Sequence, residues 1–178
     1  MRPIAEGDAA ELLSFVRRLS FGARYFRYGR PDFDLTYEQA RQTCIPDRAR
    51  RLHLLVVAQI NGSRSVVASG RIIFEPGKKH CELEMAVGDA WQGQGLGRRL
   101  LEALIDAARQ IGLEEMRATM LVTNTVASAL LLRRGFLVGD AAQGEAARSA
   151  RLDISRRSAG GAGRGFPPMG APVPSLED

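Results

Sequence analysis

The alternation of apolar and polar residues along the chain predicts a succession of helices and strands. Helical patterns with start and stop signals predict four helices, over residues 8–19, 36–43, 95–110 and 124–134. β-rich or alternating runs predict strands over residues 52–60, 65–74, 81–88, 115–122, 136–138 and 150–154. Residues 20–35 are aromatic and rich in arginine, and they are predicted to be irregular.

Local signals support two of these elements. Asp8 is the predicted N-cap of the first helix, with Glu11 three residues further on. The pair Asn61-Gly62 predicts a tight hairpin turn between the first two strands. The early strands are therefore expected to form an antiparallel meander.

The order of the elements predicts the fold class. Helices come first, then the meander, and then an alternation of strand, helix, strand, helix and strand. This order predicts a mixed α/β (α+β) architecture, with a mostly antiparallel central sheet flanked by helices on both faces. Residues 1–154 are expected to form this domain. Residues 155–178 are rich in glycine, proline, alanine and serine without periodicity, and they are expected to be a flexible tail.

The charge of the chain narrows the range of partners only slightly. The formal net charge is +5, and it comes almost wholly from arginine, because Lys78 and Lys79 are the only lysines. The arginines are spread along the chain and form no stripe with interleaved aromatic residues. Weak attraction to polyanions follows, but a specific nucleic-acid function does not.

The sequence also indicates a cytoplasmic chain without a metal centre. No apolar run approaches the length of a membrane span, and the first residues do not resemble a signal peptide. Cys44 and Cys81 lie far apart and are expected to be reduced thiols. With only two histidines, no zinc site can be assembled from the spacing.

The most informative chemistry lies between the strand 81–88 and the helix 95–110. Gly93, Gly95 and Gly97 let the backbone approach a ligand closely and turn several N–H groups the same way. The start of the following helix adds free N–H groups and the positive end of its dipole. An anion is therefore expected here, most plausibly a phosphate. A Walker loop is excluded because its lysine and hydroxyl are missing, and a dinucleotide fingerprint is disfavoured by Arg98.

The segment Gln92-Gly93-Gln94-Gly95-Leu96-Gly97 fits the pattern Gln/Arg-x-x-Gly-x-Gly/Ala. It resembles the pyrophosphate-binding loop of the GNAT superfamily of N-acetyltransferases, which use acetyl-CoA. A second stretch resembles another signature of that superfamily, because Asn124-Thr125-Val126-Ala127 opens a helix that ends in Gly135-Phe136. The resemblance covers about residues 2–154 and is most specific over residues 81–136.

A narrower resemblance lies near the N-terminus. Arg2-Pro3-Ile4 and the aromatic, arginine-rich run Arg24-Tyr25-Phe26-Arg27-Tyr28 look like the acetyltransferase domain of bacterial protein-lysine acetyltransferases. This branch transfers an acetyl group to a protein lysine.

The resemblance implies acetyl-CoA as cosubstrate and no metal. The pyrophosphate is expected on backbone N–H groups of the glycine-rich loop, with a charge-assisted contact from Arg98 or Arg99. The backbone of Val87 would hold the pantetheine arm and supply the oxyanion donor. Asn124 would contact the coenzyme, or it would be a plain N-cap. The expected coenzyme-binding residues are Val87, Gln92, Gln94, Gly95, Gly97, Arg98 and Asn124.

Acetyl transfer to an amine also needs a base, since an amine such as lysine is mostly protonated at neutral pH. Glu82 and Glu84 stand two residues apart in a predicted strand and so share one face. The resemblance places a carboxylate at Glu82, which is the expected base. Glu84 is the second candidate, with a solvated strand face as its more ordinary interpretation.

The sequence departs from the family at the general acid. Many GNAT enzymes carry a tyrosine where this chain has Leu131, which cannot protonate a thiolate. Either Tyr25, Tyr28 or Tyr37 replaces it, or the thiolate leaves unassisted.

The predicted function is acetyl transfer from acetyl-CoA to a primary amine by direct attack in a ternary complex. A protein lysine is preferred as acceptor over a small-molecule amine. The alternative is a non-catalytic acyl-CoA sensor. Acceptor pockets in such folds are lined by variable N-terminal segments, here residues 20–50. Arginines 24, 27, 30 and 41 of that segment would suit an acidic acceptor or simply be solvated. The acceptor stays unidentified, and the oligomeric state, including a homodimer, stays open.

Overall fold

The computed structural model describes residues 1–141 and 144–155. The predicted tail lies outside the described residues, except for Ser155. The helices are α1 (Ala9–Arg18), α2 (Phe21–Tyr28), α3 (Tyr37–Cys44), α4 (Leu96–Ile111) and α5 (Thr125–Arg133), with short 3-10 turns at Glu6–Asp8 and Asp89–Trp91. The strands are β1 (Arg2–Pro3), β2 (Arg51–Ile60), β3 (Ser63–Phe74), β4 (His80–Val87), β5 (Glu115–Leu121), β6 (Leu137–Val138) and β7 (Ala147–Asp153).

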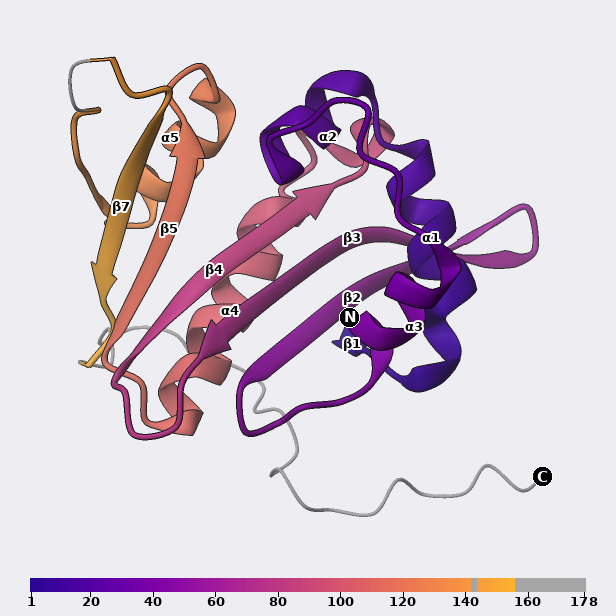
Figure 1. Cartoon of the computed structure of the whole chain (residues 1–178), viewed down its shortest axis with the longest axis horizontal. Coiled ribbons are helices and arrows are strands. Elements are labelled where there is room, and N and C mark those ends of the chain that lie inside the picture. Colours follow the sequence, from indigo (N-terminus) through magenta and orange to yellow (C-terminus); the bar gives the residue numbers. More distant parts are fainter. Residues whose placement is uncertain (142–143, 156–178) are drawn as a thin grey trace.

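The strands form one sheet in the order β1-β2-β3-β4-β5-β7-β6 (Figure 1). Every neighbouring pair is antiparallel except β4 and β5, which run parallel. The helix α4 makes the crossover between these two strands, as a parallel connection requires. The predicted fold class, a mixed and mostly antiparallel sheet, is confirmed.

Helices cover both faces of the sheet and give the chain two apolar layers (Figure 1). On one face α4 is buried against the central strands, and Leu100 and Leu104 are fully enclosed. The approach is so close that a Cβ at Gly70 of β3 would stand 2.8 Å from Leu104 Cδ1. On the other face Phe15 and Val16 of α1 pack with Ala40 and Cys44 of α3. The predicted two-sided arrangement is therefore confirmed.

The prediction of an irregular segment over residues 20–35 is wrong for α2. The Ser20 hydroxyl accepts a hydrogen bond from the Ala23 N–H at 3.2 Å, which caps the helix. Gly29 ends it with a φ of 71°, in the left-handed region that favours glycine. None of the eight residues of α2 is fully buried. The helix spans only eight residues and includes Gly22, which weakens the local signal for a helix.

The predicted N-cap position of the first helix, Asp8, is confirmed, but its side chain has another role. Asp8 makes no capping bond to α1 and instead forms a two-point ion pair with Arg2, at 2.7 and 2.5 Å. Its carboxylate also accepts the N–H of Ala5 at 2.7 Å. The hydrogen bonds from Arg2 outweigh burial and lower the pKa of Asp8. Asp8 thus fastens the first strand to the start of α1.

Both cysteines, Cys44 and Cys81, are buried free thiols. Among the described residues no helix is long and apolar enough to cross a membrane. Within the same part of the chain, no group of three histidine, cysteine or acidic side chains could hold a metal ion.

Candidate active site

The sheet opens between its two parallel strands. Residues 80–82 of β4 pair with residues 115–117 of β5, and beyond them the two strands diverge (Figure 1). The remainder of β4 stays paired with β3, up to Val87 opposite Ala68, and β5 stays paired with β7. Each strand therefore turns an unpaired backbone edge toward the gap, called here the β4–β5 opening. Such edges can hydrogen-bond an extended ligand in place of a strand.

A cavity of about 300 Å³ lies in the β4–β5 opening, below α2 and beside α5. This volume is at the lower end of the range for small-molecule sites. The cavity is lined by Phe26, Arg27, Glu82, Leu83, Glu84, Met85, Ala118, Thr119, Met120, Asn124, Ala127, Leu130 and Leu131. It thus brings together both predicted carboxylates with Asn124 and Leu131.

The glycine turn, defined as residues 92–97, leads into α4 and has the form of an anion site. Gly93 and Gly95 have φ values of 73° and 77°, which strain an L side chain. Among the described residues, none accepts a hydrogen bond of ordinary geometry from the backbone N–H groups of residues 93–98. These donors lie at the N-terminus of a helix of 16 residues, where its dipole is positive. They can therefore receive a phosphate.

The glycine turn packs against the cavity. A Cβ at Gly97 would lie 3.6 Å from side-chain atoms of Leu130 and Val87 and 3.8 Å from Met85. Leu130 and Met85 both line the cavity. A ligand with a phosphate on the turn can therefore extend an arm into the β4–β5 opening.

The polar side chains of the glycine turn hold it in place. Gln92 donates to the carbonyl of Val87 at 3.0 Å, and Gln94 donates to the carbonyl of Ala90 at 2.9 Å. Arg98 donates to Glu102 at 3.1 Å, one helical turn further along α4. In this arrangement the backbone of the turn faces outward for a ligand, while these side chains make contacts within the chain.

The two candidate carboxylates have different surroundings. Glu82 is exposed and stands where β4 and β5 begin to separate. Glu84 is half-buried, and its Oε2 accepts from Arg27 Nη2 and Arg71 Nε, each at 2.5 Å. Burial alone would raise the pKa of Glu84, but the two guanidinium groups outweigh it, and the pKa is lowered. Glu84 is thus held as an anion in an ion-paired cluster.

Asn124 and Val87, two of the predicted coenzyme contacts, differ in whether they line the cavity. Asn124 caps α5, because its Oδ1 accepts from the N–H of Ala127 at 3.0 Å, and it also lines the cavity. Both interpretations of this residue are therefore compatible with its position. Val87 ends β4 beside the glycine turn and lies outside the cavity lining.

Leu131 is buried in the cavity wall, and its side chain has no hydroxyl group that could protonate a thiolate. The lining residues include no tyrosine. Tyr28 stacks on Phe33 with ring centroids 3.9 Å apart, and burial raises the pKa of Tyr28. Tyr25 and Tyr37 are exposed.

Sequence reasoning missed the cationic partners of Glu84. Arg71 faces Glu84 directly in the register of β3 and β4, and Arg27 reaches it from α2. The register between β3 and β4, set by the turn at residues 75–79, offered the one usable signal, because it places Arg71 on the same face as Glu84. The contact with Arg27 depends on the packing of α2 and had no local signal.

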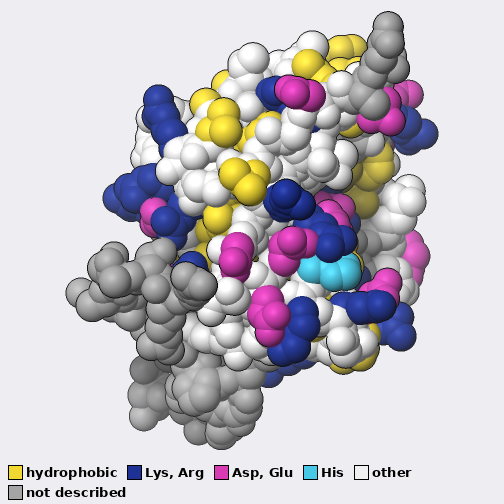
Figure 2. All heavy atoms as spheres, turned by 90° about the vertical axis from the view of Figure 1, so that its left-hand side faces the viewer, with side chains coloured by type: hydrophobic (Ala, Val, Ile, Leu, Met, Phe, Trp, Pro, Cys, Tyr) yellow, Lys and Arg dark blue, Asp and Glu magenta, His cyan; other side chains and the backbone are white. Residues whose placement is uncertain are grey.

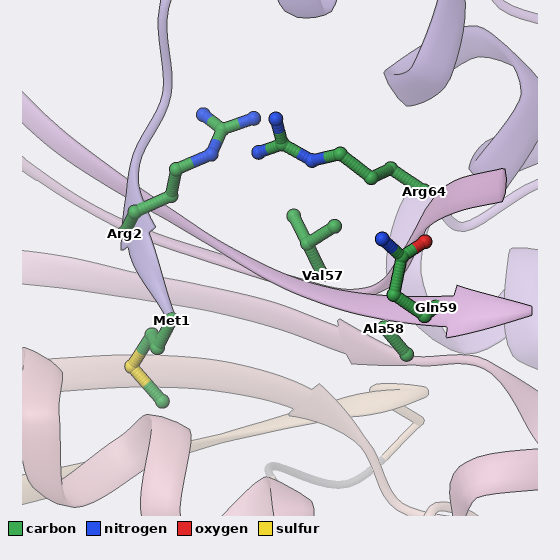
Figure 3. Close-up of a pocket in the computed structure, with 6 residues that line it drawn as sticks. All are labelled: Met1, Arg2, Val57, Ala58, Gln59 and Arg64. Carbon is green, nitrogen blue, oxygen red and sulfur yellow. The ribbon is translucent and has the colours of Figure 1, made fainter. Parts of the chain in front are cut away.

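A second hollow, of about 290 Å³, lies at the opposite edge of the sheet, where β1 pairs with β2. In Figure 3 the guanidinium groups of Arg2 and Arg64 face each other above Val57. Its lining includes none of the predicted site residues. It is therefore separate from the β4–β5 opening.

The surface also bears on the class of partner. Figure 2 shows acidic and basic side chains interspersed on the face that includes the left-hand side of Figure 1. Ion pairs such as Glu115 with Arg117 and Glu114 with Lys79 join opposite charges at the start of β5. The visible face thus lacks the continuous basic stripe that is typical of a nucleic-acid interface.

Comparison with known proteins agrees with this geometry. The model of the Acetyltransferase (GNAT) family matches residues 13–136. "Acetyltransferase PA5475" of Pseudomonas aeruginosa is 26% identical over 137 residues, which cover 77% of this chain and 74% of that protein. The GNAT domain of S. lividans PAT has a TM-score of 0.74 at 25% identity, covering 85% of this chain and 88% of that one.

A further solved structure shares the fold. RimL, a ribosomal L7/L12 alpha-N-protein acetyltransferase in complex with coenzyme A, has a TM-score of 0.71 at 16% identity. The match covers 86% of this chain and 93% of RimL. The family match spans more than half of the sequence, including the glycine turn, β4, β5 and α5. The chain therefore belongs to the GNAT acetyltransferase family and is an acyltransferase.

Proposed function

We propose that this chain transfers an acetyl group from acetyl-CoA to a primary amine by direct attack in a ternary complex. The observation that carries the proposal is that the glycine turn packs directly against the β4–β5 opening. The glycine turn offers free N–H groups for a pyrophosphate, and the adjoining β4–β5 opening has unpaired strand edges and a carboxylate, Glu82.

The coenzyme is proposed to bind along this path. The backbone N–H groups of Gln94, Gly95, Gly97 and Arg98 receive the pyrophosphate. The free edge of β4 near Val87 holds the pantetheine arm and supplies an N–H to the thioester oxygen. Asn124 lies on the opposite wall, within reach of the arm. Gln92 keeps the turn in shape through its bond to Val87.

Glu82 is proposed as the general base. Its carboxylate takes a proton from the acceptor ammonium, directly or through a water molecule, and the neutral amine then attacks the thioester carbon. The new C–N bond forms, the C–S bond breaks with its electron pair leaving on the thiolate, and the second proton of the amine passes to the thiolate through solvent. Glu84 shares the strand face, but its negative charge is already paired with Arg27 and Arg71. Its lowered pKa makes it the weaker candidate.

The thiolate is proposed to leave without a protein acid. Leu131 supplies no proton, and the lining of the cavity contains no tyrosine. Thiols ionise near pH 8.5, so a thiolate is a tolerable leaving group near neutral pH.

A protein lysine is the preferred acceptor in this proposal, and a small amine is the second choice. Support comes from the similar GNAT domain of S. lividans PAT, a protein acetyltransferase. Buried free thiols at Cys44 and Cys81 are in keeping with action in the cytoplasm. The alternative function is an acyl-CoA sensor, favoured only by the missing hydroxyl at Leu131.

Release of coenzyme A from acetyl-CoA, measured against a panel of amines and lysine-containing proteins, tests the proposal. Isothermal titration with acetyl-CoA gives the binding affinity separately. Turnover with one class of acceptor supports the enzyme and identifies that class. Tight binding without turnover on any acceptor supports the sensor, and absence of binding contradicts the role of the glycine turn.

A further inference from the structure

The cluster around Glu84 carries an excess of positive charge. Arg27 and Arg71 donate to the same carboxylate oxygen, so two cations share one anion. The side chains of Arg27 and Arg71 are only 17% and 25% exposed. Among the described residues, no other acceptor takes a hydrogen bond from either guanidinium group. The Arg27 guanidinium also lies over the Tyr28 ring, 4.8 Å from its centroid. Two cations thus share one carboxylate in a partly desolvated place, and several N–H donors remain for a second acceptor.

The groups packed around the cluster do not offset this charge. His53 faces Arg71 across β2 and β3, and burial lowers its pKa to about 3, so it is neutral. Tyr28 carries no charge either, because burial raises its pKa, and its ring face attracts the Arg27 guanidinium without neutralising it. Glu82, the other carboxylate on this strand face, forms no ion pair with any described residue. An uncompensated charge in such a place is costly unless a ligand or water satisfies it.

The excess charge borders the cavity of the β4–β5 opening. Arg27, Glu82 and Glu84 all line the cavity of the β4–β5 opening. We infer that the acceptor carries a carboxylate close to its amine, and that Arg27, assisted by Arg71, binds this carboxylate while Glu82 faces the amine. This inference rests on the proposed acetyltransferase function, and it names the class of acceptor.

The spacing on β4 supports recognition at two points. Glu82 and Glu84 are two residues apart on one face, about 7 Å along a strand. The acceptor amine beside Glu82 and its carboxylate beside the guanidinium groups at Glu84 would be separated by a few bonds. A guanidinium group binds a carboxylate through parallel N–H donors, which fixes orientation as well as charge. Such a carboxylate can belong to a small amino acid or to an acidic residue beside a protein lysine.

Matched acceptors test the inference. Glycine, β-alanine and 4-aminobutyrate are each compared with their carboxamides, which keeps size and changes charge. A blocked peptide with Asp before its single lysine is compared with the same peptide carrying Asn. The ratio of kcat/KM for acid over amide is measured in wild type, Arg27→Gln and Arg27→Lys. Comparing ratios between variants cancels the difference in amine basicity between acid and amide.

Wild type is expected to prefer at least one acid over its amide by tenfold or more. Arg27→Gln should lose that preference, and Arg27→Lys should keep part of it. Arg151→Gln removes the same charge from an exposed residue that does not line the cavity, and it should behave as wild type. The arm that shows the preference, small acid or peptide, identifies the source of the carboxylate.

Two results separate failure of the inference from failure of the proposed function. Turnover without any preference for acids in wild type overturns the inference and leaves the acetyltransferase intact. If no acceptor turns over, the same pairs are titrated against the protein saturated with coenzyme A. Binding of an acid but not its amide, lost in Arg27→Gln, then supports the inference without catalysis, and equal binding overturns it. Thermal melting of each variant confirms that it is folded.

Discussion

Asp89 and Ser20 join the loop before the glycine turn to the start of α2. The Asp89 carboxylate accepts the N–H of Ser20 at 2.9 Å and its hydroxyl at 2.5 Å. The same hydroxyl caps α2 by accepting from Ala23. The helix α2, which carries Arg27 to the cavity wall, is therefore tied to the segment that leads to the proposed coenzyme site.

Replacing Ser20 with alanine should affect both stability and coenzyme binding. Loss of the N-cap is expected to lower the free energy of unfolding by about 1 kcal/mol. Loss of the hydroxyl bond to Asp89 should also weaken acetyl-CoA binding severalfold, because only the backbone N–H at position 20 then holds the loop to α2. Urea unfolding and isothermal titration measure the two effects.

Thr36→Ala provides the matched control for Ser20→Ala. Thr36 caps α3 by accepting from Gln39 at 3.2 Å and does not line the cavity. It should lose a similar amount of stability without a change in acetyl-CoA affinity. Equal affinities in the two variants would show that the link between Asp89 and Ser20 does not support the coenzyme site.

Alanine at Gly95 should impair coenzyme binding more than it impairs folding. Gly95 and Gly62 have φ values of 77° and 79°, and a Cβ at either would meet open space. Alanine at each position should therefore cost roughly 1–2 kcal/mol of stability through backbone strain alone. Gly62 lies in the β2–β3 hairpin, away from the cavity, so only Gly95→Ala should raise the Kd for acetyl-CoA. Similar Kd values for the two variants would argue against the N–H groups of the turn as the pyrophosphate site.

The fold was largely predictable, because its main signals are local. Four of the five helices, α1, α3, α4 and α5, and the β2–β3 hairpin follow from periodicity, caps and turn residues. The alternation along β4 also predicted its faces, since Leu83 packs in the core while Glu82 and Glu84 face away from it. The helix α2 was missed because it spans only eight residues and includes Gly22, an unfavourable residue inside a helix.

The site was predictable only in part. The glycine turn carries its own signal in the spacing of its glycines, and in the structure the backbone N–H groups of residues 93–98 have no acceptor among the described residues. The β4–β5 opening depends on where two strands cease to pair, and no residue encodes that alone. The difference between Glu82 and Glu84 likewise comes from Arg27 and Arg71, which approach from other elements.

Removing single tyrosine hydroxyls should leave catalysis nearly intact. No tyrosine lines the cavity, and Tyr28 is engaged in a stack with Phe33. Phenylalanine at positions 25, 28 or 37 is therefore expected to change kcat by less than about threefold, against the 100-fold or more expected of a general acid. Steady-state release of coenzyme A measures kcat. A loss of 100-fold in one folded variant would identify that tyrosine as the acid.

His53 should make the protein sensitive to acid. Burial, assisted by Arg71, Arg27 and Arg51, lowers its pKa to about 3 in the folded chain, compared with about 6.5 when unfolded. Between these values only the unfolded chain binds the proton. The free energy of unfolding should therefore fall as the pH falls from 6.5 toward 3, by up to about 1.4 kcal/mol per pH unit from this group.

Urea unfolding of wild type and His53→Gln across this range measures the contribution of His53. Other groups with lowered pKa values, Asp8, Glu84 and Asp89, add to the loss in both proteins. The difference between the two curves of unfolding free energy against pH gives the contribution of His53. Parallel curves would show that His53 is protonated in the folded protein.

The most direct test of the proposed active site is the effect of Glu82→Gln on turnover and on acetyl-CoA affinity, measured on the same preparation. Glu75→Gln, at an exposed carboxylate in the turn before β4, is the matched control. We predict that Glu82→Gln lowers kcat/KM for the acceptor by about 100-fold or more, as loss of a general base does, while the Kd for acetyl-CoA stays within twofold of wild type. Glu75→Gln should match wild type in both. If Glu82→Gln retains kcat/KM within threefold of wild type, Glu82 is not the base.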